Sequence, residues 1–472
     1  MSTPEPKATP IHPGRRPYGA YYRRMDRLTT EPDPELTRVG PGTPMGEYMR
    51  RHWQPVCLSQ ELTEVPKAIR ILGENLVAFR DRGGRVGVLE RHCVHRGTSL
   101  EFGIIQQRGI RCCYHGWQFD VDGSILETPC EPPGSRMKDN VFQGAYPAFE
   151  RDGIVFAYMG PPDEKPDFDV YDGMVLPEGT KLVPFSNIYP CNWLQVHENL
   201  IDHFHSAALH NNMTVDSVDA AIRAGTSLGA GFARLPVIQW IATRDGNGVA
   251  FTAARRVSDE KVWIRMTEIQ LPNLIQIASV APSAAELRHT TVSMTRWQVP
   301  ADDENTMVFG WRHFNDEIDP AHFGREEACG IDKIDFLDGQ TGNRSYLEGQ
   351  RAPGDFEAIT SQGAITVHGL ETPARSDVGV YMCRNLLRQA VRGNAAHDST
   401  RDAARRRGEP LPVYTSDSVL NIPRRVDGDD DALLAEVAAK VFAIMKECDQ
   451  VPSAERKAHA KRKLDEIDGG VR

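Results

Sequence analysis

Short apolar runs broken by turn residues fill the stretch from residue 51 to about residue 160. Residues 68–72, 76–80 and 86–89 form three such runs. Residues 120–123 read Asp-Val-Asp-Gly, a sequence typical of hairpin turns. Closely spaced short strands of this kind predict a small all-β domain.

The hydrophobic pattern changes after a Pro-rich stretch at residues 160–166, which we interpret as a linker. Residues 192–211 repeat apolar side chains at helical spacing, and residues 355–392 return to a helical pattern. Between them lie five longer strand-like runs with hairpin-like connections, which predict a large antiparallel sheet. These runs are residues 237–242, 249–254, 262–269, 290–299 and 306–314.

The two ends of the chain differ from its middle. The N-terminal segment is rich in Pro and Arg without periodicity, which predicts a disordered extension. The C-terminal segment predicts one amphipathic helix, with Leu433, Val437 and Val441 on its apolar stripe, followed by a charged tail. The sequence thus predicts an α+β protein in four parts. They are an extension at 1–34, a β domain at 35–160, a domain of sheet and helices at 161–425, and the C-terminal helix and tail at 426–472.

Composition narrows the classes of function. Of the 472 residues, 40% are hydrophobic and 8% aromatic, which is enough to build real cores. The formal net charge of -10 argues against nucleic-acid binding, because phosphate recognition needs clustered positive charge. No apolar run reaches the ~20 residues of a membrane helix, and residues 1–30 lack the apolar core of a secretory signal. We therefore expect a cytoplasmic protein that binds neither membranes nor nucleic acid.

Three of the nine cysteines cluster with histidine. Cys93 and His95 form a Cys-x-His pair, and after sixteen intervening residues Cys112 and His115 form a Cys-x-x-His pair. Two thiolates can hold one iron of a [2Fe–2S] cluster while two neutral imidazoles hold the other, the arrangement of a Rieske cluster. Structural zinc is the alternative, although zinc sites favour Cys-x-x-Cys and His-x₃₋₅-His pairs. Cys113 could also replace Cys112 as a ligand.

A second group of polar residues lies in the first predicted helix. Asp202, His205 and His210 fall at i, i+3 and i+8, which places them toward one side of a continuous helix. Two imidazoles and one carboxylate form the facial triad of a non-haem Fe(II) oxygenase, which leaves positions open for O₂. His197 and His203 lie off that face, and we interpret them as surface residues or as supports of the ligands. Ordinary polar helix surface is the alternative interpretation of the group.

The two motifs follow each other in a characteristic order. Cys-x-His and Cys-x-x-His precede Asn-Trp and then Glu-Asn-x-x-Asp-x-x-His-x₄-His. The chain thereby resembles the oxygenase (alpha) subunit of Rieske non-haem iron ring-hydroxylating oxygenases, and in particular their phthalate-dioxygenase-like branch. The stretches at 36–46, 113–120, 302–306 and 362–380 support this resemblance, which covers residues 36–392.

The resemblance implies a Rieske domain followed by a helix-grip catalytic domain, and it implies roles for single residues. The family's third iron ligand is a carboxylate on a later helix, and Asp355, seven residues before a Gln-Gly pair, matches it. Glu357 and Glu348 are alternatives, and helix capping is the structural alternative for Asp355. Asp202 resembles the bridging aspartate that links an iron histidine of one subunit to a Rieske histidine of its neighbour. Asn199 matches a residue near the iron.

The resemblance also implies an activity and its partners. A separate reductase, which contains flavin and an iron–sulfur cluster and uses NAD(P)H, reduces the Rieske cluster. Electrons then reach the mononuclear Fe²⁺, where O₂ binds and the substrate is oxidised. Head-to-tail homotrimers, or higher oligomers of trimers, bring the cluster of one subunit to the iron of the next. We expect an aromatic, carboxylated substrate that is dihydroxylated, monooxygenated or O-demethylated.

Arginines in the predicted sheet could bind the carboxylate of such a substrate. They are Arg255, Arg256, Arg265, Arg296 and Arg312. Two other classes of function stay open at this point. A Rieske electron-transfer protein without oxygenase activity would need only the β domain, and a zinc-stabilised binding protein would need no iron.

Overall fold

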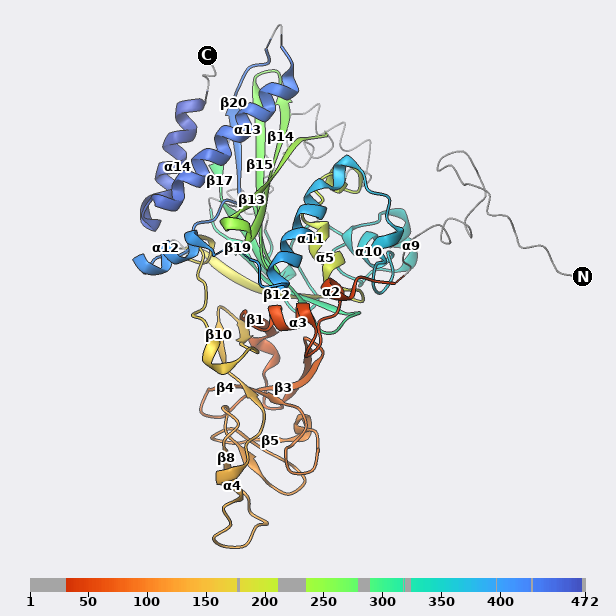
Figure 1. Cartoon of the computed structure of the whole chain (residues 1–472), viewed down its shortest axis with the longest axis vertical. Helices are drawn as coiled ribbons and strands as arrows, with labels where there is room; N and C mark the ends of the chain where they lie inside the picture. The colour runs from red at the N-terminus through yellow and green to blue at the C-terminus, as the bar shows by residue number, and fades with distance from the viewer. Residues whose placement is uncertain are drawn as a thin grey trace, which may run out of the picture.

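The computed structural model describes residues 31–175, 179–210, 235–278, 289–316, 318, 324–395, 397–425 and 428–468. This part of the chain forms an elongated molecule, with a small β-rich part at one end and a larger part of sheet and helices at the other (Figure 1). Antiparallel sheets and separate helices confirm the expected α+β class. Residues 1–30 of the expected N-terminal extension lie outside the described residues.

Three small antiparallel sheets build the β-rich part, as the dense turn pattern predicted. The first contains β1 (Gln54–Leu58), β11 (Ile154–Ala157) and β10 (Ala148–Arg151) in this order. The second contains β2 (Lys67–Ile71), β3 (Glu74–Arg80), β4 (Val86–Glu90) and β9 (Ala145–Tyr146). The third contains β5 (Ile104–Ile105), β6 (Ile110–Arg111), β7 (Gln118–Phe119) and β8 (Ile125–Glu127), and lies at the far end of the molecule (Figure 1).

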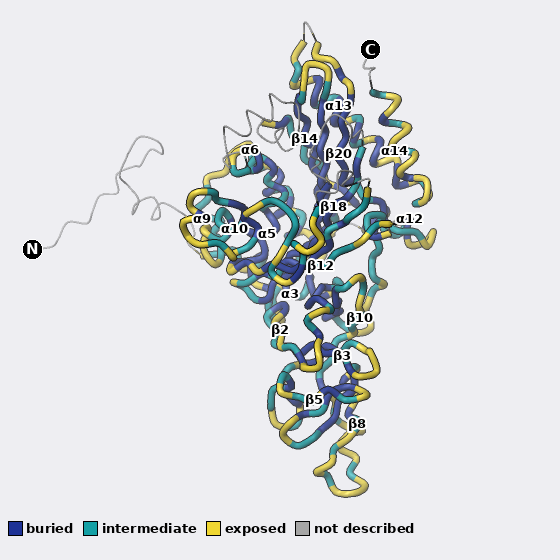
Figure 2. The backbone as a smooth tube through the Cα atoms, turned by 180° about the vertical axis from the view of Figure 1, so that it is seen from behind, coloured by how far each residue is buried: buried dark blue, intermediate teal, exposed yellow. Residues whose placement is uncertain are grey.

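One nine-stranded antiparallel sheet forms the centre of the larger part. Its main path runs β12 (Lys181–Tyr189), β19 (Thr306–Phe314), β18 (Val292–Pro300), β16 (Leu274–Ala278), β15 (Lys261–Gln270), β14 (Gly248–Ser258) and β13 (Val237–Thr243). Two further strands, β17 (His289–Thr290) and β20 (Ser416–Asn421), pair beside β15. The strands are buried along most of their length (Figure 2), because both faces of the sheet are covered.

Apart from α4 (Met137–Asn140), which lies at the far end of the β-rich part, the helices lie around this sheet (Figure 1). In chain order the helices of both parts are α2 (Pro34–Thr37), α3 (Pro44–Met49), α4 (Met137–Asn140), α5 (Trp193–Asn199), α6 (His205–Ala208), α9 (Tyr346–Arg351), α10 (Asp355–Thr360), α11 (Val378–Val391), α12 (Ser399–Arg407), α13 (Asp430–Glu447) and α14 (Ser453–Ile467). No helix among the described residues is long and apolar enough to cross a membrane.

Successive residues of a strand point to opposite faces of the sheet, so their contacts show which helices cover each face. Ala254 and Val262 belong to the same core cluster as the apolar stripe of α13. Phe251 and Ala253 belong instead to the core that includes Leu387 of α11. Helices α5 and α11 therefore cover one face, here called the inner face, and α13 covers the opposite face at one end. At its other end that opposite face meets the β-rich part.

The predicted helix over residues 192–211 is interrupted in the structure. Helix α5 ends at Asn199 and α6 begins at His205, and residue 211 lies outside the described residues. The carbonyl of Asp202 accepts a hydrogen bond from Nδ1 of His205. A side chain thus takes a backbone acceptor that a continuous helix would have used, which favours the break.

Two other helix predictions also need correction. The stretch over residues 355–392 is not one helix, because Gly363, at φ +103°, and Pro373 separate α10 from α11. The predicted charged tail folds as a second helix, α14, which starts directly after Pro452. Leu464 of α14 is buried against the core of α13. The apolar stripe of α14 is narrow, and the hydrophobic pattern alone therefore did not predict this helix.

Candidate metal centres

Two loops of the β-rich part share one backbone geometry. In the first, the N–H of Cys93 donates to the carbonyl of Thr98 over 2.9 Å, and the N–H of Gly97 donates to the carbonyl of Cys93 over 2.8 Å. In the second, Cys112 donates to Trp117 over 2.8 Å, and Gly116 donates to Cys112 over 3.1 Å. Both glycines have positive φ, +74° and +72°, a conformation that other residues rarely adopt.

The matched turns present cysteine and histidine differently. Cys93 and Cys112 are each 3% exposed, and burial raises the pKa of the Cys93 thiol to about 11. The rings of His95 and His115 are partly exposed and meet edge to face, with centroids 4.6 Å apart. Two buried thiols and two outer imidazoles are the donor set that a Rieske cluster needs, and binding to iron deprotonates such thiols.

Two residues next to the proposed ligands, Cys113 and Trp117, show which cysteine belongs to the donor set and what shields it. Cys113 is exposed, whereas Cys112 points inward, so the geometry favours Cys112 over Cys113 as the ligand. The Trp117 ring stacks on His95 at 4.5 Å between centroids and 1° between planes. Trp117 therefore shields one side of the His95 imidazole.

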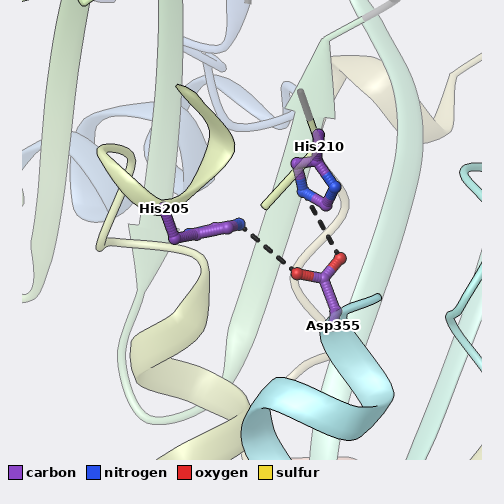
Figure 3. A group of neighbouring side chains, drawn as sticks. All are labelled: His205, His210 and Asp355. Atoms are coloured by element: carbon purple, nitrogen blue, oxygen red, sulfur yellow. Dashed lines mark ion pairs between the residues drawn. The ribbon is translucent and has the colours of Figure 1, made fainter. Parts of the chain in front are cut away.

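A second group of donors lies between α6 and α10 (Figure 3). Nε2 of His205 is 3.4 Å from Oδ1 of Asp355, and Nε2 of His210 is 3.6 Å from Oδ2 of the same carboxylate. One ligand atom from each residue lies within 4.8 Å of the other two. Two imidazoles and one carboxylate at this spacing fit a facial triad around one Fe(II) ion.

The alternative carboxylates have other partners. Glu357 forms an ion pair with Arg344 and accepts the N–H of Gly354 over 2.9 Å. Glu348 accepts the N–H of Ser345 over 2.7 Å at the start of α9. Only Asp355 of the three candidates meets the histidines.

Hydrogen bonds hold Asp355 in place. Nδ2 of Asn199 donates to Oδ1 over 3.1 Å, and Nε2 of Gln340 donates to Oδ2. Burial would raise the pKa of Asp355, but hydrogen bonds and charges from His205 and His210 hold it well below its usual range. Asp355 is therefore a carboxylate at neutral pH, the form that binds metal. Gln340 comes from a loop far from both motifs, so no motif indicated its role.

Asp202 orients His205 through its backbone rather than its side chain. Its carbonyl accepts Nδ1–H of His205, so Nε2 keeps its lone pair toward Asp355. Burial raises the pKa of the Asp202 side chain. That side chain lines a pocket of about 440 Å³, together with Asn199 and His205.

The two remaining histidines of the segment are buried, which excludes the expected surface role and leaves the other expected role, that of supports. Nδ1 of His197 lies 3.1 Å from Oε1 of Gln298 on β18. Nε2 of His203 lies 3.0 Å from a guanidinium nitrogen of Arg255, and its ring stacks on Phe251. Both residues attach the metal-binding segment to the inner face of the sheet.

Comparisons with known proteins agree with this geometry. Residues 52–147 match the Rieske [2Fe-2S] domain family, and residues 157–331 match the family described as LigXa C-terminal domain like. The crystal structure of dicamba monooxygenase with non-heme iron and dicamba superimposes with a TM-score of 0.50 at 17% identity. It covers 74% of this chain and 99% of that chain, which supports the fold.

Three relatives have assigned activities. The oxygenase subunit of tert-butanol monooxygenase / tert-amyl alcohol desaturase from Aquincola tertiaricarbonis is 62% identical over 95% of this chain and 96% of its own length. Phenoxybenzoate dioxygenase subunit alpha from Ectopseudomonas oleovorans is 37% identical, over 82% and 90%. The phthalate 4,5-dioxygenase oxygenase subunit from Pseudomonas putida is 36% identical, over 79% and 88%.

These relatives exclude the zinc-protein and electron-carrier alternatives. Each of them is a subunit of an oxygenase, and the similarity to this chain extends over nearly the whole length of each. The donor sets described above fit both metal groups of such an enzyme. The chain therefore belongs to the Rieske oxygenases, as an oxygenase subunit that carries a Rieske [2Fe–2S] cluster and a mononuclear iron.

Proposed function

We propose that the protein is the oxygenase component of a multicomponent monooxygenase that oxidises a C–H bond of a small branched alcohol. His205, His210 and Asp355 hold the mononuclear Fe²⁺, and Cys93, His95, Cys112 and His115 hold the Rieske cluster. The observation that carries this proposal is the convergence of His205, His210 and Asp355 on one point, from segments 145 residues apart. The iron supplies O₂ binding and activation when it is bound.

The electron path in this proposal crosses between subunits. The third sheet, whose neighbouring loops carry the cluster ligands, lies at the far end of the β-rich part, well away from α5 and α10 (Figure 1). A head-to-tail homotrimer, alone or in a higher oligomer, would bring the cluster of one subunit to the iron site of the next. Asp202 lines the pocket beside His205 and would accept an imidazole N–H of the neighbouring cluster there.

The substrate class departs from our expectation of an aromatic carboxylate. The relative at 62% identity is named for tert-butanol and tert-amyl alcohol, whereas the relatives named for aromatic acids share 36–37%. The higher identity over nearly the whole chain supports a branched alcohol. The aromatic acid stays as the second candidate, because it is what the phthalate-dioxygenase-like motifs suggested.

The electron donor would be a separate reductase with flavin and an iron–sulfur cluster. The relative at 62% identity is named as an oxygenase subunit, which supports a separate donor. A reductase that uses NAD(P)H would place the reaction in the cytoplasm.

Metal analysis and O₂ uptake test this function together. We expect about three iron atoms and two acid-labile sulfides per chain, two irons in the cluster and one at the triad. With reductase and NADH supplied, O₂ uptake should depend on tert-butanol or tert-amyl alcohol and exceed that with phthalate or benzoate. Alcohol-independent uptake with fast oxidation of an aromatic acid would contradict the substrate class. About two irons and no uptake with either class would contradict the oxygenase function.

A further inference from the structure

The inner face of the sheet directs a row of side chains toward the metal-binding segment. Directly paired residues of neighbouring strands share a face, so Arg296 of β18 lies beside Ile275 of β16 and Gly310 of β19. Gln298, two residues further along β18, shares that face and meets His197 of α5. The side chain of Arg296 therefore projects from the same face that α5 covers.

The five arginines proposed from the sequence as substrate ligands differ in their partners. Arg256 pairs with Asp430, Arg265 with Asp417, and Arg312 with Asp335. Arg255 meets His203. Arg296 is 4% exposed, and it has no hydrogen bond or ion pair with any residue that the structure describes.

Glycine at position 310 admits the Arg296 side chain, whose buried Nε has no partner among the described residues. A Cβ at Gly310 would lie 2.8 Å from Cβ of Arg296, so glycine at this position gives the arginine its space. Other buried atoms at this face also lack partners among the described residues, namely Nε2 of Gln298, Nε2 of His197 and Oδ1 of Asn187. Several buried unpaired polar atoms in one region indicate a site that something polar fills.

Arg296 also lies within electrostatic reach of the iron site. Burial lowers the pKa of its guanidinium, while the charges of Tyr189 and Asp355 oppose this change. Asp355 does not bond to it, because both carboxylate oxygens face His205, His210, Asn199 and Gln340. The arginine thus adjoins the metal site and keeps its donors free of Asp355.

A buried, unpaired guanidinium is costly unless a ligand supplies an acceptor. We propose that Arg296 binds an oxygen atom of the substrate and so orients its C–H bonds toward the triad of His205, His210 and Asp355. The hydroxyl of a branched alcohol and the carboxylate of an acid share this acceptor chemistry. The inference deepens the proposed function and rests on it.

Substitution of Arg296 separates substrate binding from stability. In the full chain with cluster and iron in place, Arg296→Met should raise the KM and the Kd for tert-amyl alcohol by ~10- to 100-fold, as loss of a charged hydrogen bond does. The Kd for 2-methylbutane, which has the same carbon skeleton without the hydroxyl, should change by less than ~3-fold. Arg296→Lys, which keeps the charge, should recover part of the lost affinity.

Arg265→Met is the matched control for stability. Arg265 faces the same side of the sheet but pairs with Asp417 over 3.0 Å, so its loss leaves a buried carboxylate unpaired and should lower the Tm. Arg296→Met should not lower the Tm, because Arg296 has no partner to lose among the residues that the structure describes. A lowered Tm with an unchanged Kd for the alcohol would overturn the inference.

A parallel series with benzoate and phthalate identifies the source of the acceptor. If Arg296→Met loses affinity for the alcohol alone, Arg296 binds the hydroxyl. If it loses affinity for the acids alone, Arg296 binds the carboxylate. If wild-type protein oxidises aromatic acids but no alcohol, the proposed substrate class fails, while an acid-specific loss in Arg296→Met still supports the role of Arg296. Unchanged binding of both classes in Arg296→Met overturns that role even where the enzyme oxidises alcohols.

Discussion

Asp355 shows how one residue can satisfy two requirements at once. It is the first residue of α10, where a carboxylate interacts favourably with the positive end of a helix. Its two oxygens meanwhile face one histidine each. Asp355 does not cap the helix, because the N-cap is Gly354 and Glu357 accepts the N–H of Gly354. Its place in the first turn and its contact with the histidines are compatible.

Replacement of Asp355 should remove the mononuclear iron alone. Asp355→Asn takes away the charged ligand, so we expect a loss of about one iron per chain and at least ~10-fold lower iron affinity, with acid-labile sulfide unchanged. Glu357→Gln is the control, since Glu357 pairs with Arg344 and does not meet the histidines. Iron analysis of both purified variants tests this prediction. Full iron content in Asp355→Asn would refute the assignment of Asp355 as an iron ligand.

Asp202→Asn should keep both metal groups and slow the transfer of electrons between them. The backbone carbonyl that orients His205 stays in place, so iron content should not change. Without a carboxylate to accept an imidazole N–H, we expect product formation from reduced enzyme to slow by ~10- to 100-fold. Rapid-quench measurement of a single turnover tests this. Asp377→Asn, which removes a carboxylate from the same pocket, should react at nearly the wild-type rate.

At the scale of elements, α11 clamps the helix that carries Asn199. Arg384 of α11 is buried and forms ion pairs with Glu198 of α5 and with Glu371. The neighbouring residues Arg388 and Arg392 pair with Asp33 and Glu35 near the start of the described chain. Glu198 immediately precedes Asn199, which donates a hydrogen bond to Asp355. The ion pair of Arg384 with Glu198 therefore holds Asn199 in position.

The buried part of this clamp should matter far more than its exposed part. Arg384→Met leaves Glu198 and Glu371 without their cation, and we expect a loss of about 3–5 kcal/mol of stability. Arg392→Met removes a pair whose arginine side chain is 58% exposed, which should cost no more than ~1 kcal/mol. Thermal denaturation followed by circular dichroism compares the two. Equal shifts would show that burial of Arg384 does not determine its contribution.

At the scale of the whole molecule, buried neutral histidines connect the fold to pH. Burial lowers the pKa of His197 to about 4 and that of His313 to about 3, from the ordinary value of 6.5. The unfolded chain therefore takes up protons below about pH 6.5 that the folded chain does not. Their contribution to stability is complete above pH 6.5 and is lost progressively as the pH falls toward 4.

The unfolding temperature should accordingly fall between pH 7 and pH 5. His313→Gln removes one of these groups and should make the decline shallower, since glutamine can keep the hydrogen bond to Thr295 but does not titrate. Calorimetry at several pH values, with iron content measured in each sample, tests the change in slope. A slope identical to that of the wild type would exclude His313 as a contributor.

The sequence by itself determined the chemistry and the order of the parts. Cys93, His95, Cys112 and His115 could be proposed as cluster ligands because each pair is contained in one short loop, where spacing along the chain determines geometry. Several strands of both parts were also predictable, because alternation and turn residues act locally. Strands β12, β16 and β20 of the large sheet were not among the five predicted runs. His205 and His210 were named on the mistaken premise of one continuous helix, and the structure brings them together through a break instead.

Tertiary structure decided what depends on distant segments. Only folding brings Asp355 to the histidines. The sequence indicates Asp355 as a ligand through the family resemblance alone, with Glu357 and Glu348 as alternatives. The support from Gln340, the burial of His197 and the lack of a partner for Arg296 among the described residues have no local signature. Each depends on which side chains other strands and helices place beside it, and a one-dimensional pattern contains no information on those neighbours.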